Sequence, residues 1–273
     1  MVLEQLLGKR AITRHAPYVF LLSILYVFIA FSVQYLFFPE QSVTMILLVT
    51  LLLAPSLHHL TNVEEKIERT GSKHFFSKHK TIIKCYFFAF LGTLAGFFIL
   101  GTIASDALAY QTIMLEHEDI SPSTLSRFEQ FTPSLEIAAG LFTHNLSYLL
   151  MGFFLALFYG AGSVFLIVYN ASFFAAFVLQ ILGRWEFFTQ GGILQIGAIP
   201  FIHLVPESLA FIMTAIAGTT LSRAFLCEQL KSQAFKNVLQ NSVLLLISAI
   251  VFLATAALLE VFVTAPMLQS LLF

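Results

Sequence analysis

Long apolar runs recur along the whole sequence and decide what this chain can fold into. Hydrophobic residues make up 58% of it and charged residues 11%, a composition that excludes a soluble globular fold. A helix of about 20 apolar residues crosses a bilayer, so we expect an all-α, polytopic protein of the cell membrane with about seven transmembrane helices. The expected spans lie near residues 17–38, 43–60, 82–105, 136–158, 163–183, 198–221 and 241–262.

The distribution of lysine and arginine predicts the orientation in the membrane. Twelve of the 14 basic residues lie before the first run, between the second and third runs, or between the sixth and seventh; the exceptions are Arg127 and Arg184. Because basic residues accumulate on the cytoplasmic side, the N-terminus is expected in the cytoplasm and the C-terminus outside. The longest outer connection, residues 106–133, is acidic. Its role is not readable from the sequence.

The sequence also limits the kinds of partner to expect. Residues 1–80 carry the first two runs and a basic loop expected in the cytoplasm, and residues 81–273 carry the other five runs. The second run is among the least regular, because it ends at Pro55 and a pair of histidines. The basic loop is interpreted as a solvated connection, with binding to anionic lipid as the alternative. The lipid bilayer and unidentified membrane proteins are the expected partners, and the net charge of −1 gives no reason to expect nucleic acid.

His203 and Glu207 form an ionisable pair inside the sixth run. Placing a carboxyl group at membrane depth costs roughly 2.5–3.5 kcal/mol, so such groups usually face the interior and have partners. The spacing of four residues puts both side chains on one helical face, which continues through Thr214 to Gly218. Pro206 removes one backbone hydrogen bond, which predicts a kink beside Glu207. This face is therefore the first candidate for a functional site.

Polar residues on the fourth and fifth runs are expected at similar depths. At a rise of about 1.5 Å per residue, His144 and Asn145 reach the level of His203 and Glu207, and Asn170 lies nearer the midplane. These five residues are predicted to form one polar cluster in the outer half of the membrane. Cys85 and Cys227 have no metal-binding spacing, and we expect neither a cofactor nor a metal ion.

Gly92 and Gly96 form a Gly-x-x-x-Gly motif in the third run. Such a motif lets two helix backbones approach closely. Packing within the chain is the favoured interpretation, and contact between two copies in a homodimer is the alternative.

The order of these motifs resembles the stage II sporulation protein M family. Its members carry a paired Asn-Asn, a Tyr-Asn-Gly and a Pro-His-Gly-x-x-Glu. Here Asn145 matches the second asparagine and His144 occupies the place of the first; Asn170 matches, with Ala171 in place of glycine. His203 and Glu207 match, with Ile202 and Leu204 where proline and glycine are typical. The resemblance covers the third to seventh runs and makes the first two an additional N-terminal unit.

Three functions remain open from the sequence. The resemblance implies a membrane component that recruits envelope-remodelling partners and is not itself a known enzyme, which favours a scaffold or assembly subunit. The alternative is a transporter or channel component that uses Glu207 and His203 in a proton or cation pathway. The third is an intramembrane hydrolase with His144, His203 and Glu207 as metal ligands or acid–base groups. No catalytic residue is assigned, because the usual helical zinc signature is absent.

Overall fold

The computed structural model describes residues 16–39, 41–68, 75–117, 131–160, 162–182 and 197–272. Helices account for nearly all of this part, and it contains no strand. The arginines at 127 and 184, the basic residues before the first helix, and residues 118–130 of the acidic outer connection lie outside the described residues. The helices are α3 (Ala16–Phe37), α4 (Ser42–Glu68), α5 (Phe75–Ile103), α6 (Ala109–His117), α8 (Leu135–Phe158), α9 (Gly162–Leu182), α11 (Phe201–Cys227), α12 (Gln233–Leu259) and α13 (Ala265–Leu272), with a 3-10 turn η1 (Ser105–Leu108) and a π turn η4 (Glu260–Thr264).

Six helical segments of the described chain are long and apolar enough to cross a membrane. The prediction of an all-α membrane protein is therefore confirmed. The number of seven spans and the sides of the two termini stay predictions. The six segments are Pro17–Phe37, Lys80–Ile103, Leu135–Phe158, Gly162–Leu182, Phe201–Cys227 and Gln233–Ser270.

The expected second span corresponds to α4. Its apolar part within the described residues covers Val43–Pro55, and the helix continues to Glu68. An apolar stretch of 10–14 residues is typical of a buried or partly inserted helix, because about 20 residues are needed to span. The helix α4 is thus longer than the apolar stretch described within it.

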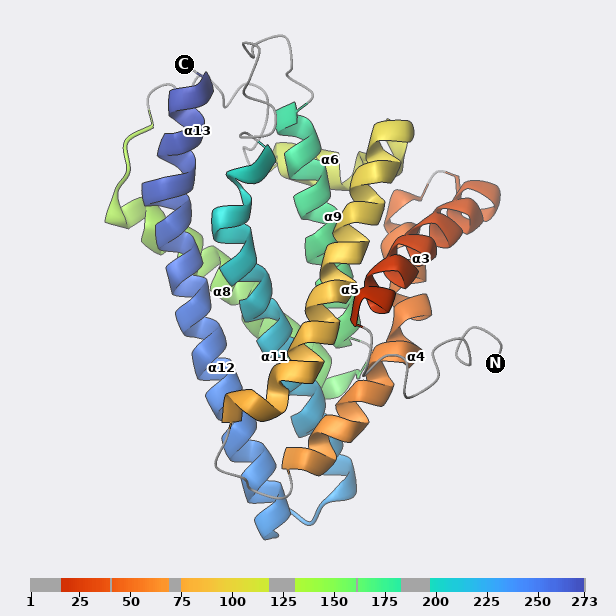
Figure 1. Ribbon diagram of the computed structural model, residues 1–273, viewed down its shortest axis with the longest axis vertical. Coiled ribbons are helices and arrows are strands. Elements are labelled where there is room, and N and C mark those ends of the chain that lie inside the picture. Colours follow the sequence, from red (N-terminus) through yellow and green to blue (C-terminus); the bar gives the residue numbers. More distant parts are fainter. Residues whose placement is uncertain are drawn as a thin grey trace.

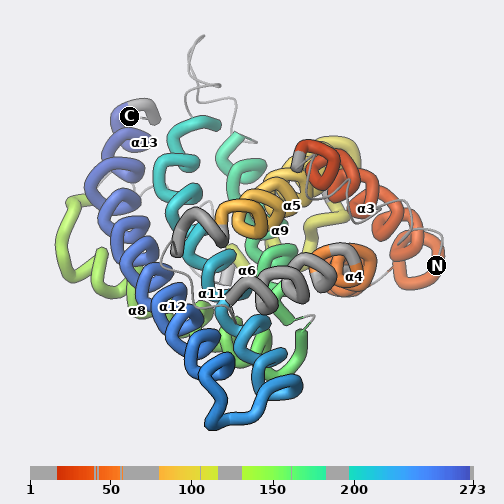
Figure 2. Tube along the Cα trace, turned by 60° about the horizontal axis from the view of Figure 1, so that its bottom comes forward, coloured from red at the N-terminus to blue at the C-terminus, as the bar shows by residue number. Residues whose placement is uncertain are grey.

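Helix α11 lies at the centre of the bundle. Its residues are buried without interruption from Ala210 to Leu221, and it packs against α12, α8, α9, α4 and α5. Figure 1 shows α11 between α12 on one side and α5 and α9 on the other, with α3 and α4 beyond α5. Figure 2 shows the same order from a second direction. A polar residue on α11 is therefore placed among helices.

Small residues bring α3 against α5. A Cβ atom added at Gly92 would lie 2.9 Å from the Cα atom of Phe20, and one at Gly96 would lie 3.0 Å from the Cβ atom of Val27. The Gly-x-x-x-Gly motif thus serves packing within one chain. The N-terminal helix is joined to the core through this contact, and the boundary at residue 80 stays a prediction.

The last helical segment is longer than the run that predicts it. The sequence predicts residues 241–262, whereas the segment extends over 38 residues, from Gln233 to Ser270. At about 1.5 Å per residue this is roughly 57 Å, well beyond a hydrocarbon core of about 30 Å. The segment must therefore tilt strongly or project from the bilayer. Its interior carries the π turn η4.

Candidate functional site

A hydrogen bond joins α11 to the π turn. His203 Nδ1 lies 3.1 Å from Thr264 Oγ1, and both side chains are buried. No ion pair and no hydrogen bond joins His203 to Glu207 in the described chain, although the two lie one helical turn apart. The histidine is thus held by a neighbouring helix.

A second carboxyl group, that of Glu260, lies within electrostatic range of Glu207 on the neighbouring element η4. Glu207 is 6% exposed, and Glu260, at the start of η4, is partly buried. The two groups are near enough for the charge of Glu260 to act on Glu207. Neither carboxyl group accepts a hydrogen bond or forms an ion pair within the described residues. We call Glu207 and Glu260 the carboxyl pair, and together with His203 and Thr264 the polar junction.

No described lysine or arginine forms an ion pair with the carboxyl pair. Arg223, the basic residue of α11, is 16 positions further along the helix, or roughly 24 Å at 1.5 Å per residue. Two carboxylates within electrostatic range of each other in a poorly hydrated interior do not both carry a full charge without compensation. The pair therefore requires either a proton on one carboxyl group or a cation between them.

A local departure from the α-helix shapes this site. The N–H of Ala265 donates to the carbonyl of Glu260, a bond across five residues instead of four. Pro266 follows directly; it lacks the N–H that would donate to Phe262, and its ring crowds the preceding turn. Such π turns are rare and are frequent at functional sites. Here the turn begins at one member of the carboxyl pair and ends at the partner of His203.

Pro206 lies inside α11, which is continuous from Phe201 to Cys227. Its ring nitrogen cannot donate to the carbonyl of Ile202. The broken backbone bond thus lies beside His203 and Glu207, as expected. The kink itself stays a prediction.

The predicted cluster of five residues does not assemble as a whole. Asn145 and His144 are neighbours in α8, and successive residues of a helix point about 100° apart. Asn145 lies with the buried stripe of α8, formed by Ala138, Leu149, Gly152 and Ala156. His144 is exposed on the opposite face, where its ring packs edge-to-face on Tyr148 with centroids 4.9 Å apart. The prediction that His144 joins His203 and Glu207 stays a prediction.

Asn170 on α9 is bound to its own helix. Its Nδ2 atom donates to the carbonyl of Leu166 at 2.9 Å, and the side chain is half-buried. This bond satisfies the amide locally. Of the predicted residues, His203 and Glu207 are thus the two that the polar junction contains.

The rest of the α11 face serves close packing. A Cβ atom added at Gly218 would lie 2.7 Å from the Cβ atom of Ala156 and 2.8 Å from the carbonyl oxygen of Phe153, both on α8. Thr214 is fully buried, and its hydroxyl oxygen has no hydrogen-bond partner. The glycine allows α8 to approach α11 at this level.

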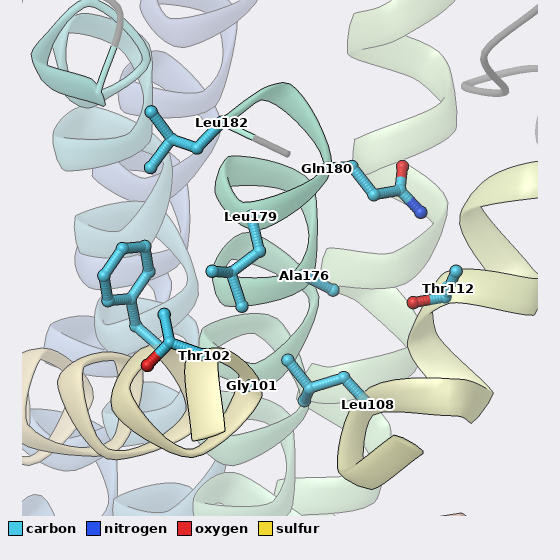
Figure 3. Close-up of a pocket in the computed structure, with 9 residues that line it drawn as sticks. Gly101, Thr102, Leu108, Thr112, Ala176, Leu179, Gln180 and Leu182 are labelled. Carbon is cyan, nitrogen blue, oxygen red and sulfur yellow. The ribbon is translucent and has the colours of Figure 1, made fainter. Parts of the chain in front are cut away.

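A separate cavity of about 460 Å³ lies between α5, η1, α6 and α9. Figure 3 shows Leu179 and Gln180 of α9 opposite Thr102 of α5 and Thr112 of α6. The described lining is mostly apolar and contains no titratable side chain. This cavity offers no acid, base or metal ligand and does not include the polar junction.

Glu260 and Thr264 were not among the residues predicted from the sequence. The sequence does contain an indication of Glu260. Like Glu207, Glu260 is an acidic residue within an otherwise apolar run. Thr264 carries no such signal, since threonine is common in membrane helices. Its role depends on the position of η4 beside α11.

The comparison with protein families agrees with the resemblance seen in the sequence. A search of curated proteins and a search of solved structures each give no match. The family model for stage II sporulation protein M matches residues 85–265, about two-thirds of the chain. The matched region runs from α5 to the end of the π turn and so contains every residue of the polar junction. The chain belongs to the stage II sporulation protein M family.

Proposed function

We propose that this protein is a membrane subunit of a transport or coupling assembly, in which Glu207 and Glu260 bind a proton or a small cation. The observation that carries the proposal is the carboxyl pair itself. Two acidic groups from different helices lie within electrostatic range of each other inside a membrane bundle, and no described lysine or arginine forms an ion pair with either. Ionisable residues at such positions typically mark proton or ion pathways.

The position of the pair suits exchange with one side of the membrane. Glu207 is six residues from the start of α11, or roughly 9 Å along the helix axis, and some 30 Å from its end. A proton or cation therefore has a short path on one side and a long one on the other. By the distribution of basic residues, the near side is the outer one.

The surrounding elements give binding a mechanical consequence. A proton on either carboxyl group, or a cation between them, removes the repulsion between α11 and η4. Release of the ligand restores that repulsion. The two elements meeting there are the parts of their helices with irregular backbone bonding, at Pro206 and at the π turn. Irregular backbone lining a site is a recurring feature of membrane transporters.

A scaffold function is the second candidate, and one observation favours it. The hydrogen bond from His203 to Thr264 ties α11 to the last helical segment, as polar groups do when they fix helices in a membrane. In that case the polar junction would set the shape of the bundle. Its protonation would have no separate purpose.

The hydrolase hypothesis finds less support. Its three candidate ligands are not assembled, because His144 lies on the exposed face of α8. Within the described residues no group of three or more histidine, cysteine, aspartate or glutamate side chains could hold a metal ion. The geometry therefore offers no reaction centre for this function.

Ion flux in proteoliposomes tests the proposal. The purified protein is reconstituted, and proton and alkali-cation movement is followed with fluorescent indicators under an imposed gradient. We expect flux with the unchanged protein and its loss in Glu207→Gln and in Glu260→Gln. Glu136→Gln makes the same chemical change at an exposed position in the first turn of α8 and should retain flux.

Two outcomes would contradict the proposal. The first is absence of flux for protons and for alkali cations with a correctly folded protein. The second is an equal loss of flux in the Glu136→Gln control. If Glu207→Gln alters only thermal stability and the recovery of co-purifying proteins, the scaffold function is the better one.

A further inference from the structure

The cavity of about 460 Å³ lies where two membrane-spanning helices end. It is formed by the last two turns of α5, around Gly101, and the last two turns of α9, around Leu179, with η1 packed against α5 and α6 against α9. Figure 3 shows these elements around the cavity. Pockets that hold small organic ligands have volumes of about 300–1,000 Å³. The space is therefore large enough for a ligand.

The surroundings of the cavity are apolar. Both α5 and α9 are long and apolar enough to cross a bilayer, and the cavity lies at their ends. Ile103, next to the lining residue Thr102, is 73% exposed, and Ile113, next to the lining residue Thr112, is 49% exposed. Contact of such side chains with lipid chains carries no hydrophobic penalty, whereas contact with water does. We therefore expect a ligand to enter from the bilayer, in the outer leaflet by the distribution of basic residues.

The lining of the cavity suits a hydrocarbon chain. Leu108, Ala176 and Leu179 supply apolar surface, and no described lining residue is titratable. An empty space beside such side chains forfeits their dispersion contacts. A charged ligand would lose its hydration there without gaining a counter-charge. The part of a ligand held in the cavity is therefore apolar and uncharged.

Two polar side chains distinguish one side of the cavity. Gln180 on α9 and Thr112 on α6 are half-buried in the wall, and neither forms a hydrogen bond within the described part of the chain. The hydroxyl group of Thr102, by contrast, donates to the carbonyl of Ile99 in its own helix. Figure 3 shows Gln180 and Thr112 on the same side, away from Leu182. An amide N–H and a hydroxyl group can each donate to an oxygen atom of a ligand.

We infer that this cavity binds one hydrocarbon chain of a membrane lipid, with an ester oxygen of the lipid accepting hydrogen bonds from Gln180 and Thr112. The ester group joins the chain to the headgroup and is uncharged, so it matches a wall that has donors and no basic side chain. The charged headgroup stays in the interface, outside the cavity. This site is separate from the carboxyl pair and does not depend on ion movement there.

Photo-labelling in proteoliposomes tests the inference. The probe is phosphatidylglycerol with a diazirine in one acyl chain, and labelled peptides are identified by mass spectrometry after illumination. We expect label on the lining segments of α5, α6 and α9. Ala176→Phe places a ring in the cavity and should reduce this label about tenfold, as overpacking of an occupied site does. Ala139→Phe, at an exposed position on α8, is the matched control and should leave the label unchanged.

A second measurement separates loss of binding from loss of folding. Thermal unfolding of delipidated protein in detergent is recorded without and with phosphatidylglycerol, because a ligand of the folded state raises the unfolding temperature. We expect a rise for the unchanged protein, a smaller rise for Gln180→Leu and no rise for Ala176→Phe. Loss of one hydrogen bond in Gln180→Leu corresponds to an affinity about fivefold lower. Without lipid, Ala176→Phe should unfold no earlier than the unchanged protein, since the ring fills an open space.

Palmitic acid with the same diazirine distinguishes a free fatty acid from a bilayer lipid. Its carboxylate would meet a described wall without a basic side chain, so its label should be weaker than that from the phospholipid. Label of equal or greater strength from the free acid would overturn the inference. Equal label in Ala176→Phe and Ala139→Phe would overturn it as well, and so would earlier unfolding of Ala176→Phe without lipid.

Discussion

His203 and Thr264 are 61 positions apart in the sequence, yet their side chains are hydrogen-bonded in the interior of the bundle, with Nδ1 and Oγ1 separated by 3.1 Å. The bond connects α11 to the π turn in the last helical segment. The same two elements carry the carboxyl pair, Glu207 on α11 and Glu260 on η4, within electrostatic range of each other. The elements α11 and η4 are thus held together by the hydrogen bond of His203 with Thr264 and are subject to charge repulsion between Glu207 and Glu260.

Replacing Thr264 by valine should weaken this connection. Valine keeps the shape of threonine and removes the hydroxyl group that pairs with His203. Interhelical hydrogen bonds in membrane proteins contribute about 0.6 kcal/mol on average and up to about 1.7. We expect a lower free energy of unfolding by that amount, measured by thermal or denaturant unfolding in detergent.

Thr255→Val is the control for this substitution. Thr255 is exposed on α12, and its hydroxyl group donates only to the carbonyl of Val251 in its own helix. An equal loss of stability in both variants would show that the bond to His203 contributes nothing specific.

The sequence predicts the class of this protein and half of its site for physical reasons. Apolar runs of membrane length have few alternatives to helices, and the spacing of His203 and Glu207 places them on one face. The partners on η4 depend on which helices are neighbours, and a single sequence does not contain that information. For this reason the sequence does not predict that Thr264 pairs with His203.

Helix α8 shows a second limit of the sequence. Its buried stripe, through Ala138 and Gly152, and its exposed stripe, through Gly140 and Ser147, have the same periodicity and similar composition. Either could face the core. The sequence predicts both His144 and Asn145 in the cluster, and in the fold His144 is exposed while the adjacent Asn145 is half-buried.

The carboxyl pair should behave as a coupled unit. If each glutamate destabilises the other, Glu207→Gln alone and Glu260→Gln alone both relieve the repulsion, and the second substitution adds little to the first. Residues in contact show interaction energies of about 0.5–3 kcal/mol in double-mutant cycles. Unfolding free energies of the two single variants and the double variant measure this term. Strict additivity would mean that the two carboxyl groups do not interact.

Pro206→Ala should stabilise α11 and reduce local opening of its backbone beside His203 and Glu207. Alanine restores the N–H that can donate to the carbonyl of Ile202, and an interior proline costs a helix about 3 kcal/mol or more. We expect slower hydrogen exchange in the first turns of α11 and a higher unfolding temperature. If proline instead shapes the bend that the bundle requires, stability falls and the predicted kink is essential for packing.

Leucine at Gly92 and leucine at Gly140 should have opposite consequences. At Gly92 the new side chain would meet the backbone of Phe20 on α3, and forcing extra atoms into a packed contact typically costs about 1–3 kcal/mol. At Gly140 it would meet nothing within the same chain. Gly92→Leu should therefore lower the unfolding temperature, and Gly140→Leu should leave it unchanged. Both are measured by thermal unfolding in detergent, each against the unchanged protein. If Gly140→Leu unfolds as early as Gly92→Leu, the contrast between the two glycines is wrong.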